Sequence, residues 1–284
     1  MKIFYSKHDE KIPYFNIPYL IPVQSGTANS DRKFDIQYHD NDGSDNISEK
    51  NDYFAELSVQ YFIYKNLEFD DNEIIGLFQE KRMLLDNYLI NTQESVNFIN
   101  APGNPTKFIR YNINKEKIND IKYLILKDNY DFSYYDFITR HTTFYLPLIP
   151  VKDYFCINND SRILNFAIEA IYKYYPDYIL PLNDMLNYTN LNLMDNVFVT
   201  KWKNFKAYSK WLFDILLHVD KQMMKVDPNF EVTKQIRKNL YEKKVVGSLS
   251  YKTYAWLAEH LFIVWILKNR MIRIEKWIGE FYFK

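Results

Sequence analysis

The chain is poor in the residues on which several classes of binding site depend. Cys156 is the one cysteine among 284 residues, which excludes an intramolecular disulfide and a zinc site built on several thiolates. The sequence holds only six glycines, and it contains no Walker loop, no Gly-x-Gly-x-x-Gly motif and no Gly-x-Ser-x-Gly motif. A glycine-rich phosphate loop is therefore not expected. Any phosphate must be bound by helix N-termini, by lysine and arginine, or through a metal ion.

Net charge and long apolar runs are also lacking. The 36 basic and 36 acidic residues cancel, whereas a protein that neutralises many phosphates carries a basic excess, so we expect no nucleic-acid partner. Residues 1–13 contain no apolar run of signal-peptide length, and Glu259 and His260 interrupt the most apolar segment, residues 253–269. Together with the single cysteine, which suits a reducing compartment, these features predict a soluble cytoplasmic protein.

Aromatic residues, in contrast, are abundant. Tyr, Phe and Trp make up 18% of the chain within a hydrophobic fraction of 47%, which is enough to build a sizeable core. Two interpretations are open: an aromatic-rich core, or a surface on which bases or sugars stack. We favour the core, because no aromatic spacing is diagnostic of stacking. The sequence shows no repeat, low-complexity tract or evident linker, which predicts one domain over residues 1–284.

The order of the predicted elements indicates an α/β fold with a mainly parallel sheet and flanking helices. Strands over residues 1–6 and 73–78 enclose a helix over residues 52–65, for which Asn51 is the expected N-cap. Residues 7–51 lack a regular pattern. Elsewhere the patterns predict strands over residues 124–126, 143–148, 196–200 and 272–284, and helices over residues 134–140, 160–174, 203–224 and 253–267.

Two aspartates, Asp40 and Asp42, form the first candidate site. Carboxylates one residue apart can share a divalent cation, such as Mn²⁺ or Mg²⁺, that also binds a diphosphate. A solvated turn is the alternative explanation, and it is the commoner one for an Asp-x-Asp pair. The pair is retained as a candidate metal site with that alternative beside it.

Charged residues follow the predicted strand over residues 73–78. Ligands of open α/β sheets bind beyond the carboxyl ends of the strands, so residues 79–82 are placed at a candidate site. Lys81 and Arg82 can neutralise a diphosphate, since a guanidinium group can contact two of its oxygens. The alternative is the solvated start of a helix.

Glu259 and His260 interrupt an otherwise apolar helix. A charge in such a helix is costly unless it is paired or faces a cleft, so Glu259 belongs either to a buried ion pair or to a functional site. Asp214 and His218 lie four residues apart on another predicted helix. They are better explained as an exposed pair on its polar face.

Four segments along residues 41–267 form a pattern when they are taken together: DNISEKNDYFAEL with QYFIYKN, EIIGLFQEKRML, DNVFV with KAYSKWLFDILLHVDKQM, and YAWLAEHLFIVWIL. In the same order, they resemble the signature blocks of one bacterial family. Its members are glycosyltransferases with an uncharacterised domain, encoded in capsular and exopolysaccharide gene clusters. The first and last blocks are the more specific ones.

The resemblance implies a GT-A-like fold, a Rossmann-type sandwich that transfers a sugar from a nucleotide-sugar donor to a glycan acceptor. Residues 1–150 would form the nucleotide-sugar-binding half, and residues 151–284 the helix-rich acceptor side. The product would be capsular polysaccharide, exopolysaccharide or lipooligosaccharide. The acceptor would be a lipid-linked glycan or an oligosaccharide, with peripheral association at the inner face of the inner membrane. The alternative is a catalytically degenerate relative that binds glycan or a partner protein.

The resemblance also implies roles for single residues. A divalent cation, or the pair Lys81 and Arg82, would stabilise the departing diphosphate. An inverting transfer needs a carboxylate that deprotonates the acceptor hydroxyl, and Glu259 and Glu80 are the candidates. The residues of the matching blocks that we assign to donor binding are Asp45, Asn46, Glu56, Lys81, Arg82, Asn196 and His260.

The chain departs from the family pattern in three of these blocks, and in one of them Asn196 matches but the neighbouring methionine is Val197. The family's His-Tyr-Arg-Arg is Gln79-Glu80-Lys81-Arg82 here, so only Arg82 matches. An arginine of the last block is replaced by His260, whereas Glu259 matches. A changed donor, a changed mechanism and lost activity are all open as consequences.

Overall fold

A mixed β-sheet forms the centre of the computed structural model, which describes residues 1–86, 109–113, 125, 132–140, 143–144, 150–188, 191–192, 194–230, 236–240, 243 and 251–283. The strands of this sheet are β1 (Lys2–Lys7), β2 (Leu20–Gln24), β3 (Tyr38–His39), β4 (Ile74–Gln79), β5 (Arg82–Leu85), β6 (Ile109–Ile113), β7 (Phe137–Arg140), β10 (Phe198–Lys201) and β11 (Arg273–Phe283). A separate small pair consists of β8 (Thr143–Phe144) and β9 (Leu191–Asn192).

The sheet is parallel on one side and mixed on the other. β3, β2, β1 and β4 are neighbours in that order, and all of their pairings are parallel. β10 then pairs antiparallel with both β4 and β7, while β11 runs parallel to β7 and β6 and antiparallel to β5. The predicted α/β architecture with a mostly parallel central sheet is confirmed.

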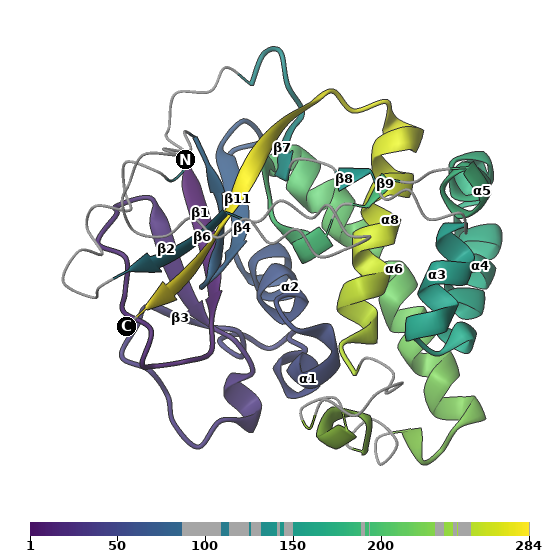
Figure 1. The fold of residues 1–284 in the computed structure, drawn as a ribbon, viewed down its shortest axis with the longest axis horizontal. Coiled ribbons are helices and arrows are strands. Elements are labelled where there is room, and N and C mark those ends of the chain that lie inside the picture. The colour runs from purple at the N-terminus through teal and green to yellow at the C-terminus, as the bar shows by residue number, and fades with distance from the viewer. Residues whose placement is uncertain are drawn as a thin grey trace.

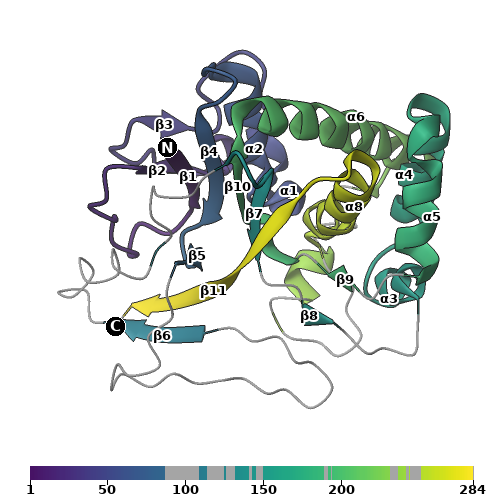
Figure 2. The same ribbon diagram turned by 90° about the horizontal axis from the view of Figure 1, so that it is seen from above.

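The helices gather on one side of the sheet (Figures 1 and 2). They are α1 (Asn51–Phe54), α2 (Leu57–Asn66), α3 (Val151–Asn158), α4 (Ser161–Tyr174), α5 (Ile179–Tyr188), α6 (Trp202–Val226) and α8 (Thr253–Asn269), with 3-10 turns η1 (Thr27–Asn29), η2 (Ser48–Lys50), η4 (Pro176–Tyr178) and η5 (Met194–Asn196). One hydrophobic cluster joins the sheet to α2, α4, α6 and α8. None of the helices in the described part of the chain is long and apolar enough to cross a bilayer.

Side chains alternate across the sheet with the two-residue period of a strand. Phe4 of β1 and Leu77 of β4 pack in the cluster on the helical side. Ile3, Tyr5 and Phe78 from the same strands belong to a second cluster with β5 and β11 on the other face. Both faces of the central strands are therefore buried, which explains the continuous apolar runs Ile3–Tyr5 in β1 and Ile74–Phe78 in β4.

The strongest sequence patterns gave the most accurate helices. α6 fills the segment predicted over residues 203–224 and extends it at both ends, and its apolar stripe from Phe205 to Met223 is buried as expected. α8 is apolar on nearly all sides and is accordingly buried along most of its length. The strands predicted over residues 1–6, 73–78, 196–200 and 272–284 correspond to β1, β4, β10 and β11.

Three predictions in the middle of the chain have other outcomes. The helix expected over residues 134–140 is wrong, because Phe137–Arg140 form strand β7, which is held between β10 and β11. A short apolar run does not distinguish a buried strand from a helix, and the pairing partners decide. Of residues 124–126, only Ile125 is described, in an isolated bridge to Leu85. The strand over residues 143–148 is described only as β8, and its remainder lies outside the described residues.

Residues 7–51 contain two strands that the sequence pattern missed. β2 includes Pro22, a residue that usually argues against a strand inside a sheet. The pairing of β2 with β3 begins only at Val23, so the missing N–H of Pro22 interrupts no bond of that ladder. Pro22 is in register with Tyr5 of β1 on one side and has no β3 partner on the other, so it is tolerated where β2 has only one neighbouring strand.

The helix predicted over residues 52–65 is interrupted. α1 ends at Phe54, Ala55 has φ 50° and ψ −130°, and α2 begins at Leu57. Asn51 is not the N-cap, since Lys50 occupies that position, and the Asn51 side chain instead donates to the Ala55 carbonyl at 2.8 Å. The interruption places Ala55 and Glu56 at the edge of a cavity.

Candidate functional site

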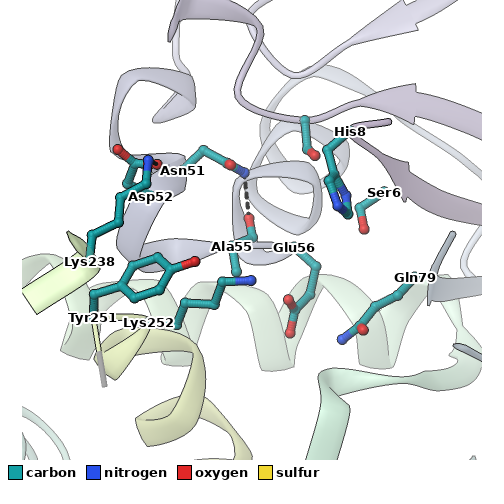
Figure 3. A pocket seen from close by; sticks show the side chains of 11 residues that line it. Ser6, His8, Asn51, Asp52, Ala55, Glu56, Gln79, Lys238, Tyr251 and Lys252 are labelled. Atoms are coloured by element: carbon teal, nitrogen blue, oxygen red, sulfur yellow. Dashed lines mark hydrogen bonds and ion pairs between the residues drawn. The ribbon is translucent and has the colours of Figure 1, made fainter. Parts of the chain in front are cut away.

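A cavity of about 290 Å³ lies at the carboxyl ends of three parallel strands (Figure 3). Ser6 and His8 at the end of β1, Ser25 directly after β2, and Gln79 at the end of β4 line one side. The remaining lining residues come from the α1–α2 junction and from the chain that precedes α8: Asn51, Asp52, Ala55, Glu56, Lys238, Tyr251 and Lys252. This is the edge of an open α/β sheet at which ligands bind.

The α1–α2 junction that lines the cavity carries backbone strain. Ala55 lies at φ 50° and ψ −130°, a region that suits glycine and that costs a residue with a side chain about 1–3 kcal/mol. The Asn51 amide holds the turn from inside, because it donates to the Ala55 carbonyl and to Ser58 Oγ, both at 2.8 Å. Because Ala55 and Glu56 line the cavity, the N-terminal end of α2 faces it.

Glu56 is the carboxylate that this junction presents to the cavity. Burial raises the pKa of Glu56 above the ordinary glutamate value, against the opposing effects of a hydrogen bond from Asn196 and of the charge of Lys252. The Asn196 amide donates to Glu56 Oε1 at 2.7 Å and also to the carbonyl of Ala255 at 3.1 Å, so its orientation is fixed. A carboxyl group with a raised pKa at a cavity is suited to accept and release a proton.

The turn η5, which carries Asn196, is also strained. Asp195 has φ 79° and Asn196 has φ 46°, two consecutive left-handed residues that are not glycine. Glu259 Oε1 accepts from the Asp195 N–H at 2.7 Å, and Gln79 donates to the Asp195 carbonyl at 2.8 Å. Glu259 therefore holds the backbone of the turn that carries Asn196, and the Asn196 amide in turn donates to Glu56.

Arg82 belongs to the same network but contacts protein carboxylates. Its Nη1 lies 2.6 Å from Asp195 Oδ1 and its Nη2 lies 3.1 Å from Glu280 Oε1. Burial alone would lower the pKa of Arg82, but the two carboxylates outweigh it and hold the pKa above the ordinary arginine value. Arg82 is not among the residues that line the cavity, and neither is Lys81, which stands in the tight turn between β4 and β5.

Glu80, in the same turn, is 1% exposed and supports the other side of the cavity. Its carboxylate lies 3.0 Å from Nδ1 of His8 and 3.8 Å from Nζ of Lys7, which is fully buried. It also accepts from the backbone N–H groups of His8 and Asp9 at 3.2 and 3.3 Å. These contacts favour a His8 ring with its proton on Nδ1, so that Nε2 remains available. The His8 side chain is 63% exposed and lines the cavity.

The predicted metal residues, Asp40 and Asp42, have their oxygens occupied by the protein. Asp40 is fully buried and accepts from Gly26 N at 2.6 Å, Thr27 N at 3.0 Å, Ser58 Oγ at 2.7 Å and Ser48 Oγ. Asp42 contacts the backbone and ring of His39 and the Lys33 amine. The described residues include no group of three or more His, Cys, Asp or Glu side chains placed to hold a metal ion.

Besides Lys81 and Arg82, three further residues assigned to donor binding, Asp45, Asn46 and His260, lie away from the cavity lining. Asp45 accepts from Tyr61 Oη at 2.7 Å and pairs with Lys65 at 3.0 Å. The Asn46 side chain bonds its own loop, at the Gly43 carbonyl and the Ser48 N–H. His260 is 5% exposed with its ring against Phe155, and burial lowers its pKa to about 4, so it is neutral near pH 7.

The structure thus brings Glu56, Asn196, Glu259 and Arg82 into one network and leaves Asp40, Asp42, Asp45, Asn46 and His260 outside it. The sequence missed His8, Lys238 and Lys252 as residues of the cavity. A usable signal existed for His8, since it lies two residues after the end of a predicted strand. No comparable signal existed for the two lysines, which precede α8 in a segment without a predicted element.

Comparisons with known proteins agree with this fold. Residues 2–270 match a family described as a domain of unknown function, DUF4422. The apo structure of WbbM, a bifunctional glycosyltransferase, is similar with a TM-score of 0.66 at 20% sequence identity, over 99% of this chain and 45% of that one. The chain thus spans less than half the length of WbbM. No curated protein matches the sequence at a significant level. The likeness shows a glycosyltransferase-like fold.

Proposed function

The chain belongs to the DUF4422 family, and on this premise we propose that it is a glycosyltransferase, which moves a sugar from a nucleotide-sugar donor to a glycan acceptor. The observation that carries the proposal is the cavity at the carboxyl ends of β1, β2 and β4, with Glu56 and two lysines around it, in a fold similar to that of a glycosyltransferase. The resemblance of the sequence blocks supports a capsular polysaccharide, exopolysaccharide or lipooligosaccharide as the product.

Glu56 is the general base in this proposal. Inverting transfer requires a carboxylate that takes the proton of the acceptor hydroxyl while the sugar carbon is attacked. Glu56 lines the cavity, and its raised pKa makes it a stronger base than an exposed glutamate. Glu259 and Glu80, the bases expected from the sequence, become positioning residues, because Glu259 contacts the η5 turn and Glu80 contacts His8.

The acceptor side of the proposal rests on the charge of residues 221–252, which carry eight basic and three acidic residues in a chain of zero net charge. Lys238 and Lys252 of this segment line the cavity. Among the described residues of this segment, four large apolar side chains are exposed: Met224 (39%), Val226 (52%), Ile236 (53%) and Leu240 (39%). Basic and apolar side chains together suit the surface of an anionic bilayer. In this proposal the end around Val226 docks on a membrane that presents a lipid-linked acceptor.

A second function is favoured by one observation. Arg82, the one residue that matches the family's His-Tyr-Arg-Arg block, is bound to Asp195 and Glu280. If the altered block has lost a catalytic group, the domain binds a glycan or a partner protein without turning over a donor. Binding of nucleotide sugar without turnover in the presence of any acceptor would favour this alternative.

The direct test is a donor screen. Purified protein is incubated with a panel of nucleotide sugars, with and without Mn²⁺ or Mg²⁺, and release of the nucleoside diphosphate is measured. We expect slow hydrolysis of one donor and an increase in its melting temperature. Glu56→Gln should abolish turnover and keep donor binding, whereas Glu49→Gln, at an exposed glutamate of the same region, should change neither. If no donor is hydrolysed and none raises the melting temperature, the proposal is wrong.

A further inference from the structure

We propose that the cavity binds the diphosphate of a nucleotide ligand through basic side chains of the protein, namely the amines of Lys238 and Lys252 and the ring of His8, and without a divalent metal ion. The inference rests on the proposed function and deepens it by naming how the ligand's charge is neutralised. Two observations support it: the carboxylate oxygens near the cavity are already hydrogen-bonded by the protein, and basic side chains lie on both sides of the cavity.

Among the residues that the structure describes, the carboxylates near the cavity do not fit a metal ion. A divalent cation of this kind needs several oxygen ligands that converge and have unused lone pairs. Asp40 accepts four hydrogen bonds from the protein, two at each oxygen, and Asp42 is held by His39 and Lys33. Asp52, in the lining itself, lies 2.7 Å from the amine of Lys238. Of the described lining residues, Glu56 is then the one remaining carboxylate, and it accepts from Asn196.

Basic side chains, in contrast, stand on both sides of the cavity (Figure 3). His8 lies on the strand side, held by Glu80, while Lys238 and Lys252 lie on the helical side. The lining also holds two carboxylates: Asp52 lies 2.7 Å from the Lys238 amine, and Glu56 is influenced by the charge of Lys252. A diphosphate carries the charge opposite to that of the two lysines, and charge-assisted hydrogen bonds to lysine are among the stronger protein–phosphate contacts.

Two helices add to this field. Glu56 precedes the first residue of α2, and Lys252 precedes the first residue of α8, and both residues line the cavity. Each helix N-terminus acts as roughly half a positive charge, because its first N–H groups have no partner within the helix. The lysines and His8 define the site, and the helix ends strengthen its preference for an anion.

Calorimetry with nucleoside diphosphates tests the inference. The full chain is titrated with UDP, GDP and ADP in EDTA and again in Mn²⁺ or Mg²⁺. We expect one of them to bind with equal affinity, within about twofold, under both conditions. Binding that appears only with the metal ion would overturn this inference and leave the proposed function in place. Absence of binding under every condition would overturn both.

Variants identify the residues responsible. Lys252→Ala and Lys238→Ala should each weaken binding in EDTA about tenfold or more, as expected for the loss of a charge-assisted contact. The matched control is Lys210→Ala, because Lys210 is exposed on α6 and pairs with Asp214 away from the cavity. Should an alanine variant fold poorly, Lys252→Arg keeps the charge and should restore most of the affinity. Affinity unchanged in both alanine variants would contradict the proposal.

Discussion

Asp40 and Glu56 are two carboxylates on either side of the same helix start, and their surroundings differ. Asp40 accepts four hydrogen bonds, which fill the acceptor positions of a carboxylate, and it is fully buried. Glu56 lines a cavity and accepts from the Asn196 amide and from its own backbone N–H. A carboxylate that the protein has saturated holds the fold, whereas one that is partly satisfied and faces a cavity can do chemistry.

The largest effect that separates these two carboxylates is expected on activity. Glu56→Gln keeps the hydrogen-bonding shape toward Asn196 and removes the proton acceptor, so donor turnover to acceptor should fall by about 10²–10⁴-fold. Steady-state kinetics should show the loss in kcat with KM for the donor little changed. The assignment of Glu56 as the general base would be contradicted if Glu56→Gln retained full activity while Glu259→Gln or Glu80→Gln abolished it with an unchanged melting temperature.

The next effect is expected on stability at the other carboxylate. Asp40→Ala leaves Gly26 N, Thr27 N and two serine hydroxyls without their shared partner, which should lower the free energy of unfolding by on the order of 3 kcal/mol. Urea unfolding measures the loss, and the more exposed Asp42→Asn should cost less than about 1 kcal/mol.

Metal addition tests whether Asp40 also binds a divalent cation. If Asp40 acts only within the protein, EDTA and Mn²⁺ should leave the melting temperature of the unaltered chain the same. A melting temperature that rises with Mn²⁺ in the unaltered chain and stays constant in Asp40→Ala would restore Asp40 as a metal ligand.

The contrast between these residues was not predictable from the sequence. The four donors to Asp40 come from Gly26, Thr27, Ser48 and Ser58, which are up to 32 positions apart. A spacing of two between Asp40 and Asp42 suggested a shared cation, but it carries no information on how many donors each carboxylate meets. Glu56 was identified through the resemblance of its block, and its contact with Asn196 joins residues 140 positions apart.

The fold was more predictable than the site, because its signals are local. α6 shows an apolar stripe over many turns, and β1 and β4 are apolar runs between polar segments, so the sequence alone was sufficient to assign them. β7 was assigned as a helix because a short run has no distinctive period, and only its pairing with β10 and β11 determines its form. Lys238 and Lys252 reach the cavity through tertiary packing, which no local pattern records.

The pH dependence of stability should differ between the unaltered chain and Glu56→Gln. Burial raises the pKa of Glu56, so the folded state favours the protonated form, and its stabilising contribution is complete below the ordinary glutamate pKa. That contribution is lost as the pH rises through the raised pKa. Relative to Glu56→Gln, the unaltered chain should therefore become less stable over this interval and then stay constant. Urea unfolding of both proteins across the interval measures the difference, and a constant difference would contradict the raised pKa.

The smallest effect concerns the strained turn between the two carboxylates. Ala55 at φ 50° and ψ −130° is costly, whereas glycine adopts this region freely, so Ala55→Gly should raise the free energy of unfolding by about 0.5–1 kcal/mol after the extra chain entropy of glycine is subtracted. Ala207→Gly, in the exposed interior of α6, should lower it by about 1 kcal/mol. Equal destabilisation by both changes would show that Ala55 is not strained. If Ala55→Gly is more stable but turns over its donor more slowly, the strain serves to hold Glu56 in place. Glu56 then differs from Asp40 in its strained backbone as well as in its hydrogen bonds.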